Sequence, residues 1–191
     1  AASSKCGSAD VLEALGVNIQ LSKEQAEEVF HTVGLVFLMA PLYHPSMKEV
    51  GAVRRELKIR TIFNILGPFA NPASTARQLT GVPNTAIART VASAAKKLGY
   101  KRILVVSSDD GMDEISLSAK TRLYDIRGSS IKKSIIDPKK YGYKKVAHSE
   151  LIGGDSSENA QIIRDILGGK HGPRRDIVVF NSAFALLAGG A

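Results

Sequence analysis

The residues best suited to chemistry in this chain stand in the acidic segment SSDDGMDEIS, residues 107–116, which directly follows the apolar run at residues 103–106. In open α/β sheets ligands collect beyond the carboxyl ends of the strands, and this segment is expected at such an end. Adjacent carboxylates there suit Mg²⁺, a hard cation that completes its shell with water and phosphate oxygens. Asp113 and Glu114 are the predicted pair, because Asp110 and Gly111 form a turn signal. The alternative is a solvated acidic loop without a ligand.

The start of the chain carries the opposite signal. The segment SSKCGSAD, residues 3–10, is a loop rich in Ser and Gly that holds Lys5 and runs into an expected helix. Free backbone N–H groups and the helix dipole favour an anion at such a place. Ser3, Ser4 and Ser8 can add hydroxyl donors, so a phosphate site is predicted here. An ordinary capped helix start is the alternative.

A third segment, PLYHPSMKEVGAVRREL at residues 41–57, contains His44 and Arg54 ten positions apart. Both could face one cleft, where an Arg would pair with a planar carboxylate. Alternatively, His44 begins a helix and Arg54 lies with Arg55 on a solvated face. The proline-rich stretch TIFNILGPFANP, residues 61–72, contains Pro68 and predicts a rigid turn that shapes a pocket wall or simply ends a helix.

The elements that must position these residues alternate between helical and strand periods. Helices are predicted after Asp10 and Ser22, over 46–57 and 61–66, from Asn84 to Leu98, after Asp155, and at the end of the chain. Strands are predicted at 35–41, 77–82, 102–107 and 176–180, and an antiparallel excursion at 121–127 and 130–136. This order predicts an α/β fold with a mostly parallel central sheet, doubly wound and flanked by helices.

Composition is that of a globular protein, with 44% hydrophobic residues over 191 positions and no linker, so residues 1–191 are predicted to form a single α/β domain. The net charge of +8 suits polyanionic partners or simply a soluble surface. One cysteine, Cys6, excludes an internal disulfide and favours the cytoplasm. From these residues we expect neither a signal peptide nor a membrane-spanning segment. Both ends look cut, so we expect a piece of a longer polypeptide.

Four stretches of the chain stand out when taken together and in order: AASSKCGSADVLEALGV (1–17), YHPSMKEVGAVRRELKIRTIFNILGPFANP (43–72), DDGMDEIS (109–116) and GGDSSENA (153–160). They resemble the stretches that mark the anthranilate phosphoribosyltransferase family of tryptophan biosynthesis. The resemblance covers essentially the whole chain. It implies a Mg²⁺-dependent enzyme, a glycosyltransferase that moves the phosphoribosyl group from phosphoribosyl pyrophosphate to anthranilate. The products would be N-(5-phosphoribosyl)anthranilate and pyrophosphate, and the fold would be of the nucleoside phosphorylase/phosphoribosyltransferase type.

The resemblance also assigns residues. Asp113 and Glu114 match the family's Mg²⁺ ligands, and Arg54 matches the arginine that binds anthranilate. His44 and Pro68 fall in stretches that line the family's anthranilate channel. No catalytic side chain is implied. The matches to phosphoribosyl pyrophosphate contacts are Ala1, Ala2, Ser3, Ser4 and Ser8.

The family's N-terminal helical domain and C-terminal helix have no counterpart in these residues, so the isolated piece is expected to be inactive. The resemblance implies a homodimer for the full-length protein, formed through the helical domain, and gives no support for dimerisation of this piece. Two other functions remain open. One is a catalytically inactive, transferase-like protein that binds nucleic acid through its basic surface, which the scattered charges and 6% aromatic content disfavour. The other is a nucleoside phosphorylase of related architecture.

Overall fold

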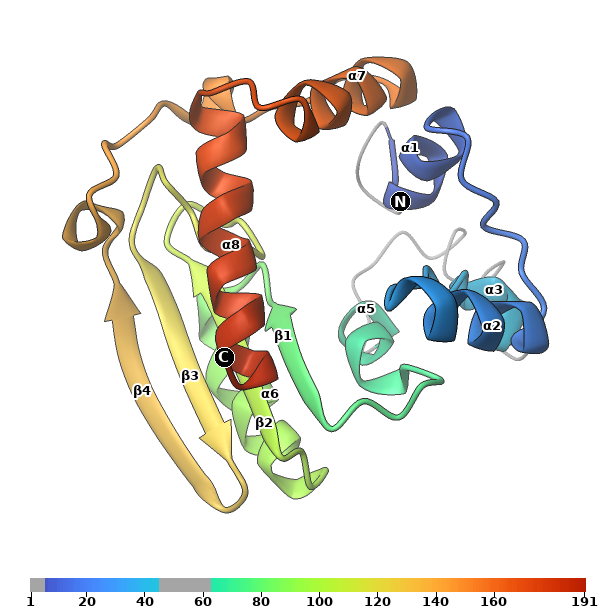
Figure 1. The fold of residues 1–191 in the computed structure, drawn as a ribbon. Helices are drawn as coiled ribbons and strands as arrows, with labels where there is room; N and C mark the ends of the chain where they lie inside the picture. The colour runs from blue at the N-terminus through green and yellow to red at the C-terminus, as the bar shows by residue number, and fades with distance from the viewer. Residues whose placement is uncertain (1–5, 45–62) are drawn as a thin grey trace, which may run out of the picture. The chain divides into compact units, whose positions relative to one another are not determined.

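The computed structural model describes residues 6–44 and 63–191, and Figure 1 shows their helices and strands. The chain divides into two compact units. Unit 1 comprises Ala1–Thr61 and Gly153–Gly168, and unit 2 comprises Ile62–Ile152 and Gly169–Ala191. The assignment of residues 1–191 to a single domain stays a prediction.

Unit 2 is built on a sheet of four strands in the order β1-β2-β3-β4. The strands are β1 (Arg77–Gly81), β2 (Arg102–Ser108), β3 (Thr121–Arg127) and β4 (Ser130–Ile136). β1 runs parallel to β2, whereas β2 pairs antiparallel with β3 and β3 antiparallel with β4. The α/β class and the antiparallel excursion are therefore confirmed. The prediction of a mostly parallel sheet is wrong for the described strands, because β2 and β3 are joined by a loop and β3 and β4 by a tight turn, and only the β1–β2 connection contains a helix.

Helices cover both faces of this sheet, with α8 (Pro173–Gly189) on the near side and α6 (Thr85–Lys97) behind it in Figure 1. All seven residues of β2 are buried, and their side chains alternate between the two faces. Leu104 and Val106 pack with α8, whereas Ile103 and Val105 pack with α6. Each such fully buried aliphatic side chain contributes about 1.5–3 kcal/mol of hydrophobic free energy. β2 is thus fixed from both sides at the centre of unit 2.

The α6 helix follows its sequence signals. Asn84 is the N-cap, and its side-chain oxygen accepts a hydrogen bond from the backbone N–H of Ala86 at 2.8 Å. The buried face consists of Ala88, Val91, Ala92 and Ala95. These positions recur every three or four residues, as the helical period requires.

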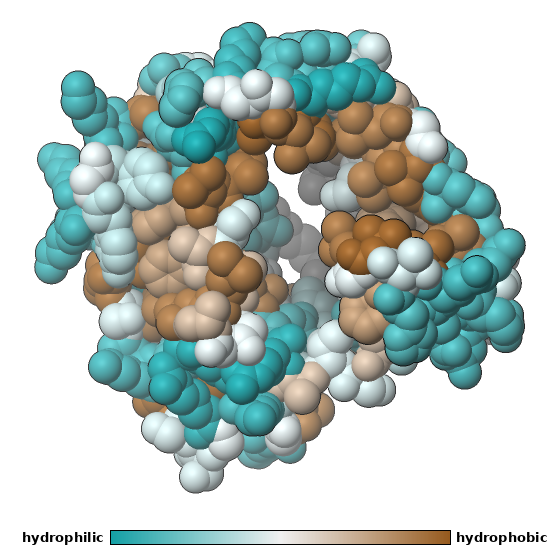
Figure 2. Space-filling model, in the orientation of Figure 1, coloured by the Kyte–Doolittle hydropathy of each residue, from teal (hydrophilic) through white to brown (hydrophobic). Residues whose placement is uncertain are grey.

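The α8 helix corrects a prediction, because residues 176–180 were expected to form a buried strand. The segment DIVVF is rich in β-branched residues, and that local preference is overridden by packing. Pro173 stands in the first turn of the helix, and Ile177, Phe180, Phe184 and Ala188 form its buried face. The remaining side is apolar as well, and Figure 2 shows hydrophobic residues along α8. The exposed large apolar side chains of this helix are Val178, Val179, Leu186 and Leu187.

Two arginines from the sheet hold the carboxyl end of α8. Arg77 donates from Nη1 to the carbonyl oxygen of Ala188 at 3.1 Å, and Arg102 donates from Nη1 to that of Leu187. The last carbonyls of a helix lack partners within it, and cations favour this end of the helix dipole. Arg102 also forms a two-bond ion pair with Asp125 on β3, with N···O distances of 3.1 and 2.9 Å. These hydrogen bonds therefore anchor the carboxyl end of α8 to β1 and β2.

Unit 1 is helical in its described residues, with α1 (Ser8–Ala14), α2 (Lys23–Val33), α3 (Ala40–Tyr43) and α7 (Ser156–Leu167). The predicted cap at Ser22 is confirmed, because Ser22 and Gln25 exchange reciprocal hydrogen bonds. Asp155 likewise caps α7 by accepting from the N–H of Glu158 at 2.9 Å. Arg164 on α7 donates to the carbonyl oxygen of Ala14 at 3.2 Å, which joins α7 to the end of α1.

Two predictions in unit 1 are wrong. Asp10 was expected to cap a helix that begins at Val11, but α1 begins three residues earlier, at Ser8, and Gly7 is its N-cap. Asp10 instead accepts a hydrogen bond from the N–H of Gly7 at 2.7 Å from within the first turn. Residues 35–41 were expected to form a buried strand, but no strand is assigned there and Leu35 is 75% exposed. Strand propensity without sheet neighbours does not form a strand.

Short helices complete unit 2. They are α5 (Phe63–Leu66), η1 (Gly67–Ala70), η2 (Pro138–Tyr141) and η3 (His148–Glu150), the last three of the 3₁₀ type. Among the described residues, no helix is both long and apolar enough to cross a membrane.

Candidate functional site

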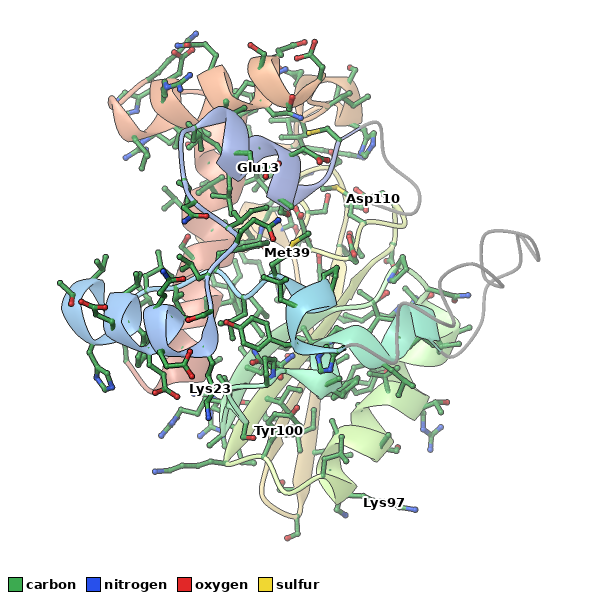
Figure 3. All side chains as sticks on the ribbon, turned by 90° about the vertical axis from the view of Figure 1, so that its right-hand side faces the viewer. Glu13, Lys23, Met39, Lys97, Tyr100 and Asp110 are labelled. Carbon is green, nitrogen blue, oxygen red and sulfur yellow. The ribbon has the colours of Figure 1, made fainter. Side chains whose placement is uncertain are left out.

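The acidic segment forms the loop between β2 and β3, at the carboxyl end of β2, as the sequence predicted. Figure 3 shows Asp110 at one end of unit 2, and Lys97 and Tyr100 at the other. Backbone hydrogen bonds close the base of the loop, from Ser108 N to Met112 O at 3.1 Å and from Asp109 N to Lys120 O at 2.9 Å. The loop therefore starts from a fixed frame.

Asp110 organises the interior of this loop. Its Oδ2 accepts a hydrogen bond of 2.6 Å from the hydroxyl of Ser116, and that hydroxyl accepts the N–H groups of Ser118 and Ala119. Burial acts to raise the pKa of Asp110, but hydrogen bonds to its carboxylate from the hydroxyls of Ser116 and Ser108 and from the backbone N–H of Met112 outweigh burial and hold the pKa below its usual range. Gly111 has a φ of +88°, which confirms the predicted turn. Asp110 is thus a structural carboxylate.

Asp109 is used differently, in an ion pair with Arg122 on β3 at 3.2 Å. Both side chains are partly exposed, so water screens the pair. This interaction ties the start of the loop to the neighbouring strand.

Asp113 and Glu114 line a pocket of about 390 Å³ within unit 2. The pocket lies beyond β1 and β2 and beside the first half of α8, where α/β sheets bind ligands. Its other lining residues come from these three elements, and are Leu79, Gly81, Val106, Ile177, Val178, Asn181 and Ser182. The structure therefore brings the predicted carboxylate pair together at one concave surface.

The pocket wall changes the electrostatics of Glu114. Burial raises the pKa of its carboxyl above the usual range, and the neighbouring Asp113 carboxylate raises it further. By solvent-accessible surface Asp113 and Glu114 are both exposed, so water screens part of this effect. A pair of carboxylates that resist being ionised together is stabilised by a cation.

Gly81, the last residue of β1, lies directly against this pair. A Cβ added at Gly81 would fall 1.4 Å from the carbonyl oxygen of Asp113. No side chain fits there, so only glycine permits this approach of the strand to the loop. This close contact fixes how near the backbone of Asp113 lies to the end of β1.

Asn181 on α8 holds the loop from the other side. Its Oδ1 accepts from the N–H of Ile115 at 2.9 Å, and its Nδ2 donates to the carbonyl oxygen of Ile115 at 2.8 Å. Sequence reasoning missed this residue, because residues 176–180 were assigned to a strand. A helical assignment of residues 173–189 would have placed an amide in the middle of an apolar helix, which is the available signal.

The donor set fits Mg²⁺. Two adjacent carboxylates supply hard oxygen ligands, and Mg²⁺ is usually held by one or two carboxylates together with water and substrate phosphates. Within residues 6–44 and 63–191, no group of three or more His, Cys, Asp or Glu residues could enclose a metal ion. An open site that depends on a ligand's oxygens is therefore the arrangement that these carboxylates favour.

The other predicted binding residues that the structure describes lie in unit 1 or elsewhere in unit 2. Ser8 is exposed in the first turn of α1, and His44 is half-buried at the end of α3, both in unit 1. Pro68 is in η1 of unit 2, where its carbonyl oxygen accepts from Gln78 Nε2 at 2.8 Å. Their assigned roles stay predictions. The predicted residues that lie outside the described part of the chain are Ala1, Ala2, Ser3, Ser4 and Arg54.

Comparison with known protein families shows to which family the chain belongs. Residues 1–191 match the family described as "Glycosyl transferase family, a/b domain". The chain belongs to this glycosyl transferase family. The family resemblance carried by the four sequence stretches is thereby confirmed.

Two curated relatives are identical to the chain at about half of the aligned positions. A protein from Ruminiclostridium cellulolyticum named anthranilate phosphoribosyltransferase is 48% identical over 184 residues, which are 96% of this chain and 54% of the relative. A protein of the same name from Endomicrobium trichonymphae is 50% identical over 184 residues, 96% of this chain and 55% of the relative. The chain spans about half the length of these curated relatives.

Solved structures of the same family confirm the fold. Anthranilate phosphoribosyltransferase from Thermus thermophilus superposes with a TM-score of 0.89 at 36% identity, over 96% of this chain and 54% of that one. The Saccharomyces cerevisiae enzyme, solved in complex with PRPP and Mg, gives a TM-score of 0.89 at 27% identity over 97% of this chain and 54% of that one. The expected phosphoribosyltransferase-like α/β architecture is therefore confirmed.

Proposed function

We propose that the polypeptide containing this chain transfers the phosphoribosyl group from phosphoribosyl pyrophosphate to anthranilate. The observation that carries the proposal is the convergence of Asp113 and Glu114 on a pocket beyond β1 and β2. It is supported by relatives named anthranilate phosphoribosyltransferase and by a structural neighbour in complex with PRPP and Mg. The products are N-(5-phosphoribosyl)anthranilate and pyrophosphate.

Asp113 and Glu114 hold the metal in this proposal. Mg²⁺ bound there would offset negative charge on the pyrophosphate as it leaves. The reaction breaks the bond from the anomeric carbon to a pyrophosphate oxygen and forms a bond from that carbon to the anthranilate nitrogen, which then loses a proton. An aniline-type nitrogen needs no strong base, so the chain's task is placement and charge stabilisation. The frame around Asp110 and Ser116 contributes by keeping the two carboxylates in place before the ligand arrives.

The remaining roles follow the family resemblance. We propose that Ala1, Ala2, Ser3, Ser4 and Ser8 contact phosphoribosyl pyrophosphate, with backbone and hydroxyl donors suited to phosphate. Arg54 binds the carboxylate of anthranilate, for which a guanidinium is the matching fork. His44 and Pro68 line the path of anthranilate. The active form is a homodimer of the full-length polypeptide.

The test follows anthranilate fluorescence in a mixture of the full-length protein, both substrates and limiting Mg²⁺. The double variant Asp113→Asn, Glu114→Gln is expected to lower the rate by about two orders of magnitude or more, because several kcal/mol of charge stabilisation depend on the metal. Asp109→Asn is the matched control, since it removes a loop carboxylate that is occupied by Arg122, and the rate is expected to stay near that of the wild type.

Two outcomes would count against the proposal. Equal rates for the wild type and the double variant would remove the metal role from Asp113 and Glu114. Absence of anthranilate turnover, combined with DNA binding that weakens steeply with salt, would support the nucleic-acid-binding alternative, since counterion release governs such binding.

A further inference from the structure

We propose that Asn181 is a positioning residue that sets the orientation of the Asp113 and Glu114 carboxylates through the backbone of Ile115. This inference rests on the proposed function only in that it takes these carboxylates as the metal ligands. Asn181 lies on α8 and contacts only the backbone of the loop at Ile115, so its effect on the metal is indirect.

The contact is a pair of hydrogen bonds to a single residue of the loop. Asn181 Oδ1 accepts the N–H of Ile115 at 2.9 Å, and Asn181 Nδ2 donates to the C=O of Ile115 at 2.8 Å. The N–H of Ile115 belongs to the peptide bond that follows Glu114. The amide of Asn181 therefore fixes the peptide plane next to the metal-binding pair, from a helix 66 residues away in the sequence.

Asn181 is itself held in one orientation. Its Nδ2 donates a further bond to the carbonyl oxygen of Ile177, one turn earlier on α8, at 3.0 Å. The neighbouring helix positions Phe180 and Phe184 are buried in the core of unit 2. Arg77 and Arg102 hold the carboxyl end of the same helix. Both N–H groups of the Asn181 amide are hydrogen-bonded, and the helix that carries it is anchored. The side chain can therefore orient the loop backbone instead of moving with it.

The loop is confined on its other side as well. Gly81 of β1 leaves no room for a Cβ beside the carbonyl oxygen of Asp113. The three residues 113–115 are therefore held between the end of β1 and the amide of Asn181. The side chain of Ile115 is fully buried in the α8-facing core, which prevents the loop from sliding past α8.

Loss of the amide would leave two buried peptide groups of Ile115 without these partners. They would recover hydrogen bonds only by moving toward water, which turns the backbone that carries Glu114. Residues that orient metal ligands from behind typically change metal affinity by about 10–100-fold when they are replaced. We therefore expect Asn181→Ala to raise the half-saturating metal concentration by about tenfold or more.

The experiment uses the full-length polypeptide and two kinds of readout. Binding of Mn²⁺ in the presence of phosphoribosyl pyrophosphate, without anthranilate, is followed by the loss of the free-ion electron paramagnetic resonance signal. Anthranilate turnover is then measured across Mg²⁺ concentrations. Asn181→Ala is expected to weaken Mn²⁺ binding and to raise the Mg²⁺ requirement, while kcat at saturating Mg²⁺ falls much less.

Two further variants separate positioning from stability. Asn181→Leu keeps the bulk of the side chain and loses its hydrogen bonds, so it should show the same metal defect. Val91→Ala removes two buried methyl groups on the α6 side of the sheet, away from the pocket, and is expected to cost about 2 kcal/mol of stability without changing metal affinity.

Each result bears on the inference. Wild-type metal affinity in both Asn181 variants would overturn it, and so would an equal loss of affinity in Val91→Ala, which would make the effect one of stability. Failure of both Asn181 variants to fold where Val91→Ala folds would assign the amide to the fold and also overturn it. A wild type that binds Mn²⁺ but does not consume anthranilate would contradict the proposed function, while the Mn²⁺ titrations would still decide the role of Asn181.

Discussion

The two halves of the acidic loop carry the same charge and are held in different ways. Asp109 and Asp110 are engaged through their carboxylate oxygens, by Arg122 and by the hydroxyl of Ser116 respectively. Asp113 and Glu114 line the pocket, and the backbone beside them is held by Gly81 at Asp113 and by Asn181 at Ile115. The first half of the loop therefore stabilises the loop conformation, and the second half places carboxylates at the pocket.

The difference also appears in the direction of the pKa shifts. Burial acts to raise the pKa of both Asp110 and Glu114. In Asp110 hydrogen bonds from Ser116 and Ser108 reverse the effect, whereas in Glu114 the like charge of Asp113 reinforces it. A carboxylate whose negative charge is stabilised by hydrogen bonds, such as Asp110, has a structural role. A carboxylate whose charge lacks such partners, such as Glu114, is suited to bind a cation.

The largest effect on this comparison should come from Gly81→Ala. The new Cβ would overlap the carbonyl oxygen of Asp113, which is backbone and cannot swing aside. We expect a loss of about 3 kcal/mol in the free energy of unfolding, measured in urea, together with weaker metal binding. Gly67→Ala is the control, since a Cβ there meets nothing within 4 Å. Equal behaviour of the two variants would show that the second half of the loop does not depend on its backbone contacts.

A smaller loss is expected from Asp110→Ala, which removes the acceptor for the buried hydroxyl of Ser116. The free energy of unfolding should fall by about 2 kcal/mol at neutral pH. Because the folded pKa of Asp110 is lowered, this contribution is complete above its ordinary value of 3.8 and is lost as the pH falls through the lowered pKa. Urea unfolding of both proteins from pH 7 to pH 2 measures the difference, and a gap that persists undiminished at pH 2 would contradict the assignment.

Much of this loop could be read from the sequence because its signals are local. The apolar run of β2 predicted the strand, Gly111 predicted the turn, and the remaining adjacent carboxylates predicted the ligand pair. Each of these features is decided by residues within a few positions of one another. The structure confirms the strand and the turn and places the pair at a pocket.

The support for the loop could not be read in the same way, because it comes from distant residues. Nothing near Asn181 marks its contact with Ile115, which is 66 positions away. The β-branched run before it predicted a strand, yet the burial of Ile177 and Phe180 at helical spacing decided the outcome. Likewise, glycine is needed at position 81 because the carbonyl of Asp113 lies against it, and not because the chain turns there.

Glu114→Gln should change stability in the opposite direction and by less. The folded pKa of Glu114 is raised, so ionisation destabilises the fold without metal, fully above that raised pKa and not at all below the ordinary value of 4.5. We expect the metal-free variant to melt at a higher temperature than the wild type at pH 7, with the two curves converging at pH 4. A variant that is less stable at pH 7 would show that the site does not strain this carboxylate.

The smallest effect should belong to the ion pair of Asp109 with Arg122. Their side chains are 42% and 38% exposed, so a double-mutant cycle with Asp109→Asn and Arg122→Gln should give a coupling below about 1 kcal/mol that shrinks with added salt. The buried pair of Arg102 with Asp125, at 9% and 13% exposure, provides the contrast, and its cycle should give the larger and less salt-sensitive coupling. If the Asp109 pair proved the stronger, the first half of the loop would depend on its surface charge rather than on the hydrogen bonds around Asp110.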